Sequence, residues 1–260
     1  MPIPFTVKAR LATRNHNTEH NDPLRVVATA RNRRTKSEEA VNTTDYRTAS
    51  RSDLIAKRSG GYAQVIAAPL RHGDYELCAL REEDIQLVRI WRNAQMEILR
   101  QNAPITAADQ GRYFQAVVKP TFSQHKPNQI LLSLLRKNEC IGYAGLTNIE
   151  WRAQRAEISF LLNPARFDPK HGYTGEPGAS YGDDFQACLA LLSTLAFDRL
   201  QLHRLFAETY DVRPTHIALL ETHGFQLEGR MRGHTTIGNR HVDSLLHGLL
   251  AADWRRSEPV

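Results

Sequence analysis

Residues 178–182 combine a serine with two glycines in a pattern that could carry chemistry. They read Gly-Ala-Ser-Tyr-Gly, the Gly-x-Ser-x-Gly pattern of a turn that exposes a nucleophilic serine between a strand and a helix. Asp211 and then His216 or His234 follow, in the order Ser, Asp, His that hydrolases with this turn use. Ser180 is therefore a candidate nucleophile of a serine hydrolase.

The residues before this serine do not supply the strand that such a nucleophile needs. Residues 171–177 read His-Gly-Tyr-Thr-Gly-Glu-Pro, and a run with this much glycine and proline does not form a buried strand. The upstream sequence also lacks the repeated strand–helix alternation that predicts a long parallel sheet. The serine hydrolase stays an alternative rather than the main interpretation.

The three cysteines, Cys78, Cys140 and Cys188, have spacings that fit no metal motif. An odd count does not suit a disulfide framework, and each cysteine stands among apolar residues. We expect small buried side chains in a reducing cytoplasm, and no metal site. No cysteine or serine stands beside a base in a credible nucleophile setting, which favours chemistry without a covalent enzyme intermediate.

The positive charge of the chain is confined to its first part. Residues 1–72 carry 13 basic and 6 acidic side chains, whereas residues 73–260 carry 21 and 22. The body is nearly neutral, which argues against nucleic acid as its partner. The longest nearly apolar run, 188–197, is too short to span a membrane, which takes about 20 residues.

Composition and periodicity divide the chain into three parts. The whole chain has 41% hydrophobic and 24% charged residues, the composition of a globular protein. Residues 1–72 show no lasting apolar period, so we predict a basic, disordered N-terminal extension. Residues 75–254 are predicted to form one folded domain, and residues 255–260 a short tail.

The folded part is predicted to be α+β, a mixed sheet flanked by helices. The loop at 163–181 is long and rich in glycine and proline, which is typical of a functional loop. Apolar periodicity predicts strands at 75–80, 130–135, 140–149, 156–162, 202–210, 225–231 and 241–250, and helices at about 81–91, 109–118, 183–200 and 214–223.

The order of these elements resembles the GNAT superfamily of acetyl-CoA-dependent N-acetyltransferases, and the resemblance covers about 75–254. The segment at 220–229 is close to the signature of the subgroup that acts on the N-termini of ribosomal proteins. Six segments carry the likeness: Ala79–Asp84, Ile141–Leu146, Ala156–Leu162, His203–Glu208, Leu220–Gly229 and Asp243–Trp254.

The resemblance implies a mostly antiparallel central sheet whose fourth and fifth strands splay apart, with acetyl-CoA as the co-substrate. The fourth strand then offers its edge, Phe160, Leu161 and Leu162, to the pantetheine arm. The pyrophosphate would lie at the N-terminus of the next helix, where backbone N–H groups and the helix dipole favour anions. The residues implied there are Gly178, Ser180, Tyr181, Gly182 and Asp183, with Arg213 as a further phosphate contact.

This loop departs from the pattern of the family. The family usually has Gln or Arg and then Gly, where this chain has Pro177 and Ser180. Asp183 and Asp184 also place negative charge beside the expected phosphates. Arg166, or Lys170 or His171 in the same loop, could compensate for that charge.

An amine attacks a thioester only when it is neutral, so the site needs a base. Glu208 aligns with the catalytic glutamate of the ribosomal subgroup, and Glu157 is the second candidate. A structural ion pair is the alternative role for either carboxylate. The tyrosine that the family uses as an acid falls at Leu220, so the resemblance leaves Tyr210, His216 or water as the proton donor.

Trp91-Arg92-Asn93 resembles a motif of GNAT enzymes that acetylate amino-sugar nucleotides. It predicts an acceptor site there, although Trp91 at helical spacing from Val88 also fits a core residue. We expect the acceptor to be the primary amine of an amino-sugar nucleotide, ahead of a protein N-terminus, with a polyamine also possible. We expect a monomer or homodimer. A non-catalytic acyl-CoA-binding module is the remaining alternative.

Overall fold

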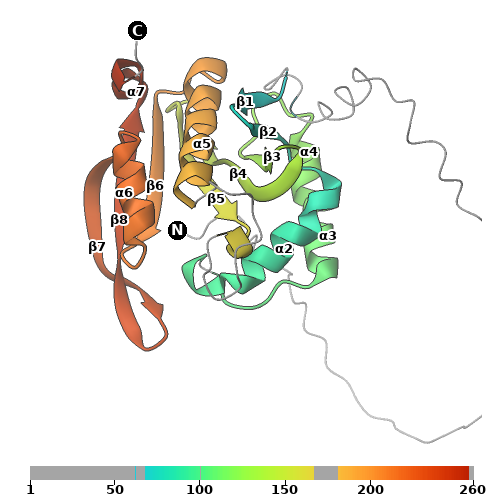
Figure 1. Cartoon of the computed structure of the whole chain (residues 1–260), viewed down its shortest axis with the longest axis horizontal. Helices are drawn as coiled ribbons and strands as arrows, with labels where there is room; N and C mark the ends of the chain where they lie inside the picture. Colours follow the sequence, from blue (N-terminus) through green and yellow to red (C-terminus); the bar gives the residue numbers. More distant parts are fainter. Residues whose placement is uncertain (1–61, 63–67, 100, 167–180, 258–260) are drawn as a thin grey trace, which may run out of the picture.

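The computed structural model describes Tyr62 and residues 68–99, 101–166 and 181–257, which form one eight-stranded sheet with helices on both faces (Figure 1). The strand order is β1-β2-β3-β4-β5-β6-β8-β7, and the β5–β6 pair alone is parallel among these strands. The strands are β1 (Leu70–His72), β2 (Tyr75–Ala79), β3 (Ile130–Arg136), β4 (Glu139–Glu150), β5 (Arg155–Leu162), β6 (Arg204–Tyr210), β7 (Gln226–Ile237) and β8 (Arg240–Leu250).

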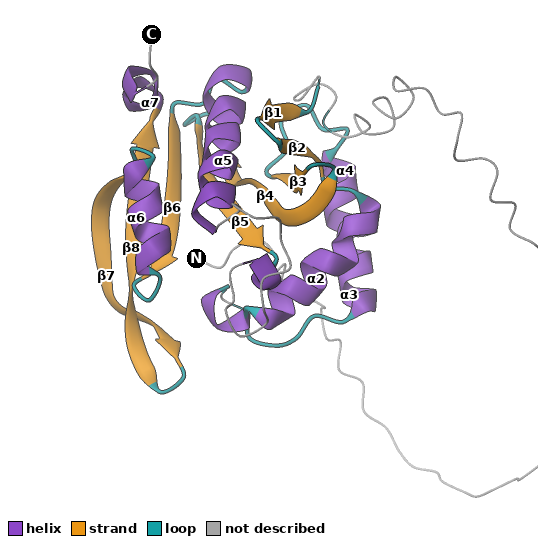
Figure 2. Ribbon diagram, viewed as in Figure 1, coloured by secondary structure: helices purple, strands orange, loops and turns teal. Residues whose placement is uncertain are grey.

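The helices cover the sheet in two layers (Figure 2). α5 and α6 pack against each other on one face, and α2 packs on α3 and on β5. The longer helices are α2 (Ile85–Ala94), α3 (Ala107–Tyr113), α5 (Tyr181–Ser193) and α6 (Pro214–Thr222); α4 (Lys119–Thr121) is a single turn, and α7 (Ala251–Ser257) follows the last strand.

Side-chain alternation along the strands fills a separate core under each layer. On β3, Ile130, Leu132 and Leu134 belong to the large core beneath α5. Leu131, which lies between them, joins the smaller core that contains Trp91 of α2. The two faces of the sheet can therefore be told apart residue by residue.

One boundary of the helix predicted around 109–118 holds for a local reason, and the other is wrong. Thr106 caps α3, because its hydroxyl accepts a hydrogen bond of 3.1 Å from the Asp109 N–H. The helix was expected to end before Pro120, but it continues through a π-helical stretch, Phe114–Val118, into α4. Pro120 lies in the first turn of α4, where a missing N–H is tolerated.

Gly145 is required by the close approach of two strands. A Cβ at this position would lie 2.2 Å from the Ile130 carbonyl oxygen of β3. A Cβ at Gly142 would lie 2.6 Å from the Leu161 carbonyl oxygen of β5. Both positions therefore need glycine, because the backbone of the neighbouring strand comes too close for a side chain. A glycine inside a strand often marks such a position.

The pairing of β5 with β6 stops after three residues. Arg155, Ala156 and Glu157 pair with Arg204, Leu205 and Phe206, and the two strands diverge beyond that point. The divergence confirms the predicted sheet with a splay between the strand at 156–162 and the next one. It is the feature of the fold that creates the site.

The sheet begins earlier than the periodicity indicates. β1 pairs with β2 through Leu70, Arg71 and His72, and Tyr62 is completely buried in the core. A strand of three residues and a lone tyrosine carry too little pattern to be recognised. The division of the chain at residues 1–72 and 75–254 stays a prediction. None of the described helices is long and apolar enough to cross a membrane.

Candidate active site

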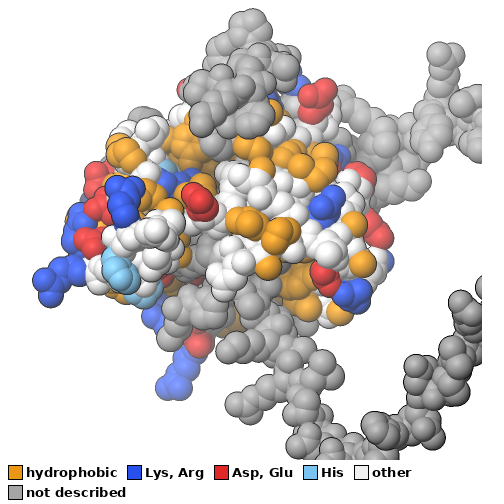
Figure 3. Space-filling model, turned by 90° about the horizontal axis from the view of Figure 1, so that it is seen from below, with side chains coloured by type: hydrophobic (Ala, Val, Ile, Leu, Met, Phe, Trp, Pro, Cys, Tyr) orange, Lys and Arg blue, Asp and Glu red, His pale blue; other side chains and the backbone are white. Residues whose placement is uncertain are grey.

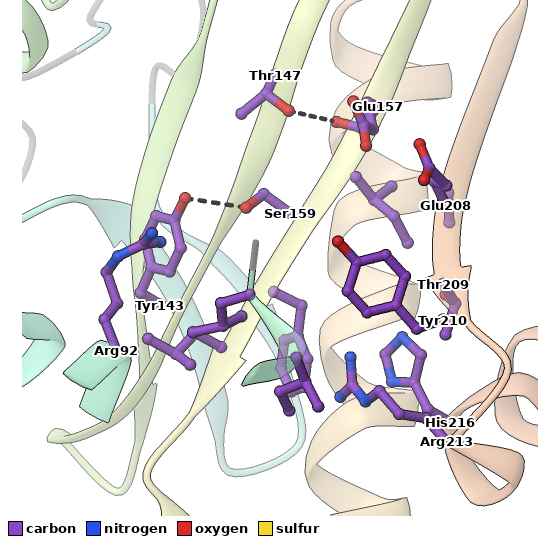
Figure 4. A pocket seen from close by; sticks show the side chains of 16 residues that line it. Arg92, Tyr143, Thr147, Glu157, Ser159, Glu208, Thr209, Tyr210, Arg213 and His216 are labelled. Carbon is purple, nitrogen blue, oxygen red and sulfur yellow. Dashed lines mark hydrogen bonds between the residues drawn. The ribbon is translucent and has the colours of Figure 1, made fainter. Parts of the chain in front are cut away.

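A cavity of about 760 Å³, counted out to its open mouth, lies in the splay between β5 and β6 (Figure 4). β5 contributes the run from Glu157 to Leu161, and β6 contributes the run from Ala207 to Tyr210. The rest of the lining comes from α2 and the turn after it, from β4 and from the start of α6: Arg92, Ile98, Leu99, Tyr143, Thr147, Arg213 and His216.

Residues from both faces of the sheet meet in this cavity. Leu205 and Ala207 of β6 point into the core beneath α5, so by alternation Glu208 and Tyr210 point to the opposite face. Phe160 of β5 packs against that large core. The splay therefore opens to both faces of the sheet. The carboxylates lie on the face covered by α2, and the other face is covered by α5 and α6.

Glu208 is held at the base of the splay by β8 and approached by β7. Its Oε1 accepts a hydrogen bond of 2.7 Å from the Ser244 hydroxyl. His234 Nε2 lies 3.6 Å from the same oxygen, and 11% of the Glu208 side chain is exposed. Glu208 is therefore a positioned carboxylate that still reaches the cavity, as a base must.

Glu157 is the second carboxylate of the same cavity. It stands at the last paired position of β5, and its Oε2 accepts a hydrogen bond of 2.7 Å from the Asn148 amide. In Figure 4 it lies beside Glu208 at the same end of the cavity. The structure thus brings together the two carboxylates that the sequence predicts as bases.

The free edge of β5 faces the splay with alternate backbone groups. The Asn163 N–H donates to Ile141 of β4, whereas the Leu162 carbonyl oxygen accepts from Gln95 on the other side. Backbone groups alternate along a strand, so those of Ile158 and Phe160 point into the splay. Phe160 and Leu161 line the cavity, and Leu162 is buried.

The expected pyrophosphate loop lies partly outside the described residues, because Gly178 and Ser180 belong to 167–180. Tyr181, Gly182 and Asp183 form the first turn of α5. Asp184 points inward and is fully buried, where Arg166 binds it through Nε at 2.7 Å and Nη2 at 3.0 Å. Arg166 therefore compensates the charge of Asp184.

Tyr181, His216 and Arg213 join the start of α5 to the start of α6. The Tyr181 hydroxyl lies 2.7 Å from His216 Nδ1 and accepts a hydrogen bond of 3.0 Å from Arg213 Nη2. The His216 ring stacks on Phe185 at 4.2 Å. Burial lowers the pKa of His216 well below its ordinary value, and Arg213 and His247 act in the same direction.

A second cavity of about 660 Å³ continues from the first at this point. Its lining includes Tyr181, Val212, Pro214 and Thr215, and it shares Arg213 and His216 with the cavity in the splay. The starts of α5 and α6 both contribute to it. Backbone N–H groups at a helix start suit an anionic group such as a phosphate.

The structure gives the three residues of Trp91-Arg92-Asn93 different roles. Trp91 is 5% exposed and belongs to the smaller core, which is the alternative that its spacing offered. The Asn93 side chain holds the following turn, because its Oδ1 accepts from Ile105 N and Gln101 Nε2. Arg92 alone of the three lines the cavity.

One lining residue, Tyr143 of β4, carries no signal in the sequence. It reaches across to β5, where its hydroxyl lies 2.9 Å from that of Ser159. Tyr210 of β6, a candidate proton donor in the sequence, points into the middle of the cavity (Figure 4). Leu220, at the position of the family tyrosine, is fully buried in the large core. Such contacts between distant strands become visible only in the folded chain.

The β7–β8 hairpin brings His234 close to the Glu208 carboxylate. Gly233 has a positive φ of 56° in a bulge where residues 232–234 lie opposite Asp243 alone. Asp243 fixes the bulge by accepting a hydrogen bond of 2.8 Å from the Gly233 N–H. Basic side chains and histidines gather on the hairpin side of the molecule (Figure 3). The bulge is the local distortion from which His234 reaches Glu208.

The sheet splays between β5 and β6, with helix starts at the mouth of the splay and carboxylates at its base. Residues 77–246 match the sequence profile of the acetyltransferase (GNAT) domain, which covers more than half of the chain. The chain therefore belongs to the GNAT family and is an acyltransferase. The mostly antiparallel sheet also excludes the α/β-hydrolase interpretation of Ser180, which requires a parallel sheet.

Solved structures share this fold. A spermidine N-acetyltransferase from Vibrio cholerae, in complex with CoA and spermine, matches with a TM-score of 0.56 at 17% identity, covering 71% of this chain and 99% of that chain. A dodecameric structure of spermidine N-acetyltransferase from the same organism has a TM-score of 0.53 at 19% identity, covering 72% and 100%. A probable acetyltransferase has a TM-score of 0.55 at 18% identity, covering 73% and 100%.

Proposed function

We propose that this chain transfers the acetyl group of acetyl-CoA directly to the primary amine of an acceptor bound in the splay, with Glu208 as the base. The observation that carries the proposal is the cavity itself. It joins the free edge of β5 to a positioned carboxylate on β6. A thioester on one side and an amine on the other would meet at the point where the strands part.

The residues on the α5–α6 side fit acetyl-CoA. The alternate backbone groups of β5 at Ile158 and Phe160 suit the amides of a pantetheine arm. The first turn of α5, with Tyr181, Gly182 and Asp183, would hold the pyrophosphate together with Arg213. The ion pair of Arg166 with Asp184 removes the main electrostatic objection to an anion at this helix. The structure with CoA among the solved neighbours supports the same donor.

Glu208 would take the proton of the amine, directly or through one water molecule. Its hydrogen bond from Ser244 fixes one carboxylate oxygen, and the exposed fraction of its side chain leaves room for the second to face the acceptor. Glu157 would act beside it by attracting the cationic amine before the proton leaves. His216 is the proposed proton donor on the opposite side of the splay.

Two features of the cavity bear on the acceptor. The guanidinium of Arg92 fits an anionic group such as the diphosphate of an amino-sugar nucleotide. The carboxylates of Glu157 and Glu208 fit a cationic acceptor such as a polyamine, which is what the spermidine N-acetyltransferases of Vibrio cholerae act on. We keep the amino-sugar nucleotide as the proposed acceptor, because Arg92 belongs to the segment that resembles enzymes of that kind.

The test is a screen of three amines with the full chain: spermidine, a hexapeptide with a free N-terminal alanine, and a dTDP-linked 4-amino sugar. Release of the CoA thiol reports turnover. We expect turnover with the dTDP-linked sugar. Turnover with spermidine or the peptide alone would overturn the acceptor class, and no thiol release with any of the three would overturn the proposed function.

The role of Glu208 is tested by Glu208→Gln. We expect turnover to fall by about 10²–10⁴, the usual contribution of a general base, while calorimetry shows little change in acetyl-CoA affinity. The pH–rate profile should also lose its acidic limb. Turnover like that of the unsubstituted chain would move the base to Glu157 or to the acceptor itself.

A further inference from the structure

The transfer proposed above leaves a thiolate that must be protonated, and the position of the donor follows from the two cavities. In the proposed transfer the acyl group and the amine would meet in the cavity between β5 and β6, and the pantetheine arm would arrive from the cavity at the starts of α5 and α6. The sulfur would then lie between the two. His216 lines both cavities, whereas Tyr210 lines only the first and comes from the carboxylate side of the sheet.

The hydrogen bonds around His216 fit one tautomer of its neutral ring. Arg213 only donates, so the Tyr181 oxygen is the acceptor of that 3.0 Å contact. When the Tyr181 hydroxyl donates to His216 Nδ1 at 2.7 Å, the ring carries its own proton on Nε2. The ring is held in place by its stacking on Phe185.

We propose that His216, Tyr181 and Arg213 form a proton relay for the leaving thiolate: His216 Nε2–H donates to the sulfur while the Tyr181 hydroxyl donates to His216 Nδ1. The S–H and Nδ1–H bonds form as the Nε2–H and O–H bonds break. The negative charge moves from sulfur to the Tyr181 oxygen, beside the Arg213 guanidinium. The proton that Glu208 took from the amine returns through solvent and restores the hydroxyl. This relay rests on the proposed acetyl transfer.

The charges around the relay suit it. Burial raises the pKa of Tyr181 and Arg213 opposes that rise, so the hydroxyl keeps its proton while its anion has a cation beside it. His247 of β8 and Arg213 disfavour a cationic His216. The Cys188 thiol of α5 adds a smaller contribution at Tyr181. In this scheme His216 is the catalytic residue, and Tyr181 and Arg213 are positioning residues that act through it.

The test uses Tyr181→Phe, which keeps the buried ring and removes only the hydroxyl. Single-turnover formation of CoA, measured by rapid quench with whichever of the three amines is turned over, reports the chemical step. We expect Tyr181→Phe to slow that step by about 10-fold or more, within the range of acid catalysis. Acetyl-CoA affinity should change little, because the backbone of Tyr181 and not its hydroxyl would meet the phosphates. In mixtures of H2O and D2O the rate of the unsubstituted chain should curve, because two protons move, and the Tyr181→Phe rate should fall on a straight line.

Tyr75→Phe is the matched control. The Tyr75 hydroxyl donates to Asp184 of the same helix at 2.9 Å and lines neither cavity. The Tyr75→Phe variant should leave unchanged both the rate and the curvature of its dependence on the D2O fraction. Arg213→Gln serves as a second variant and should slow the same step. A straight line for the unsubstituted chain, or an unchanged rate in Tyr181→Phe, would overturn the relay alone. Failure of the unsubstituted chain with all three amines would instead overturn the proposed function, and the relay with it.

Discussion

Asp184 and Arg166 form a buried ion pair at the start of α5. The Asp184 side chain is 1% exposed and that of Arg166 is 11% exposed, so both charges are largely removed from water. A carboxylate in this position would repel phosphate if it were uncompensated. The bidentate guanidinium neutralises it and ties the loop after β5 to the helix.

Replacing Arg166 by alanine should therefore destabilise the fold as well as the site. Among the described residues, the buried Asp184 carboxylate would keep only the Tyr75 hydroxyl as a partner, and breaking a buried pair in this way costs about 3–5 kcal/mol. Urea unfolding measures the loss. Arg112→Ala, which breaks the exposed pair with Asp109, should cost far less, because water screens an exposed pair. Equal losses in the two variants would contradict this account.

At the scale of elements, long periodic segments could be predicted and short or distorted ones could not. The stripe from Phe185 to Leu195 predicts α5, and the apolar run at 130–135 predicts β3. The second half of β7 was missed because the bulge at residues 232–234 interrupts its period. β1, with three residues, and α7, with seven residues directly after β8, are too short to show a period of their own.

The candidate site divides in the same way. Glu157, Glu208 and His216 could be named before the fold was known because the family resemblance assigns roles to positions on recognisable strands and helices, and all three line one cavity. Ser244 and the Tyr181 hydroxyl take their roles from contacts across elements far apart in the chain, which no local pattern reports. Trp91 and Asn93 were expected to bind substrate, but the structure gives them packing and loop-holding contacts.

The first turn of α5 carries a prediction that belongs to the element rather than to one side chain. If the phosphates approach this backbone closely, a branched side chain at Gly182 blocks them. Gly182→Val should weaken acetyl-CoA binding strongly in calorimetry. Gly111→Val, in α3 where a Cβ meets nothing within 4 Å, should not change the affinity. Unchanged affinity in Gly182→Val would remove the donor from this helix start.

For the whole molecule, buried histidines make the fold sensitive to acid. Burial lowers the pKa of His223 to about 4 from an ordinary value of 6.5. Between these two values the unfolded chain binds the proton and the folded chain does not, so the free energy of unfolding falls as the pH falls. The loss is up to about 1.4 kcal/mol for each pH unit in that window.

His223→Gln should flatten this dependence between pH 6.5 and 4, because glutamine can keep a hydrogen bond to Ser193 without titrating. His216 contributes in the same direction and should leave a residual slope. Chemical unfolding at a series of pH values gives the comparison. His203→Gln, at an exposed position, is the control and should leave the slope unchanged. A His223→Gln slope equal to that of the unsubstituted chain would refute the assignment.

Tyr62 links the N-terminal part of the chain to the core of the domain. It is fully buried, and its ring meets Phe122 edge-on at 4.9 Å. Its hydroxyl accepts a hydrogen bond of 2.9 Å from the Leu131 N–H and lies 3.0 Å from the Thr121 hydroxyl. One residue therefore connects the segment before β1 with the helical layer and with β3, at the centre of the sheet.

This connection predicts two graded losses of stability. Tyr62→Phe keeps the ring but leaves the buried Leu131 N–H without its acceptor, which should lower the free energy of unfolding by about 1–3 kcal/mol. Tyr62→Ala also opens a cavity in the core and should cost about 3–5 kcal/mol. Thermal and urea unfolding of the full chain measure both. If Tyr62→Ala unfolded like the unsubstituted chain, the domain would begin at β1, and the segment before it would contribute nothing to the fold.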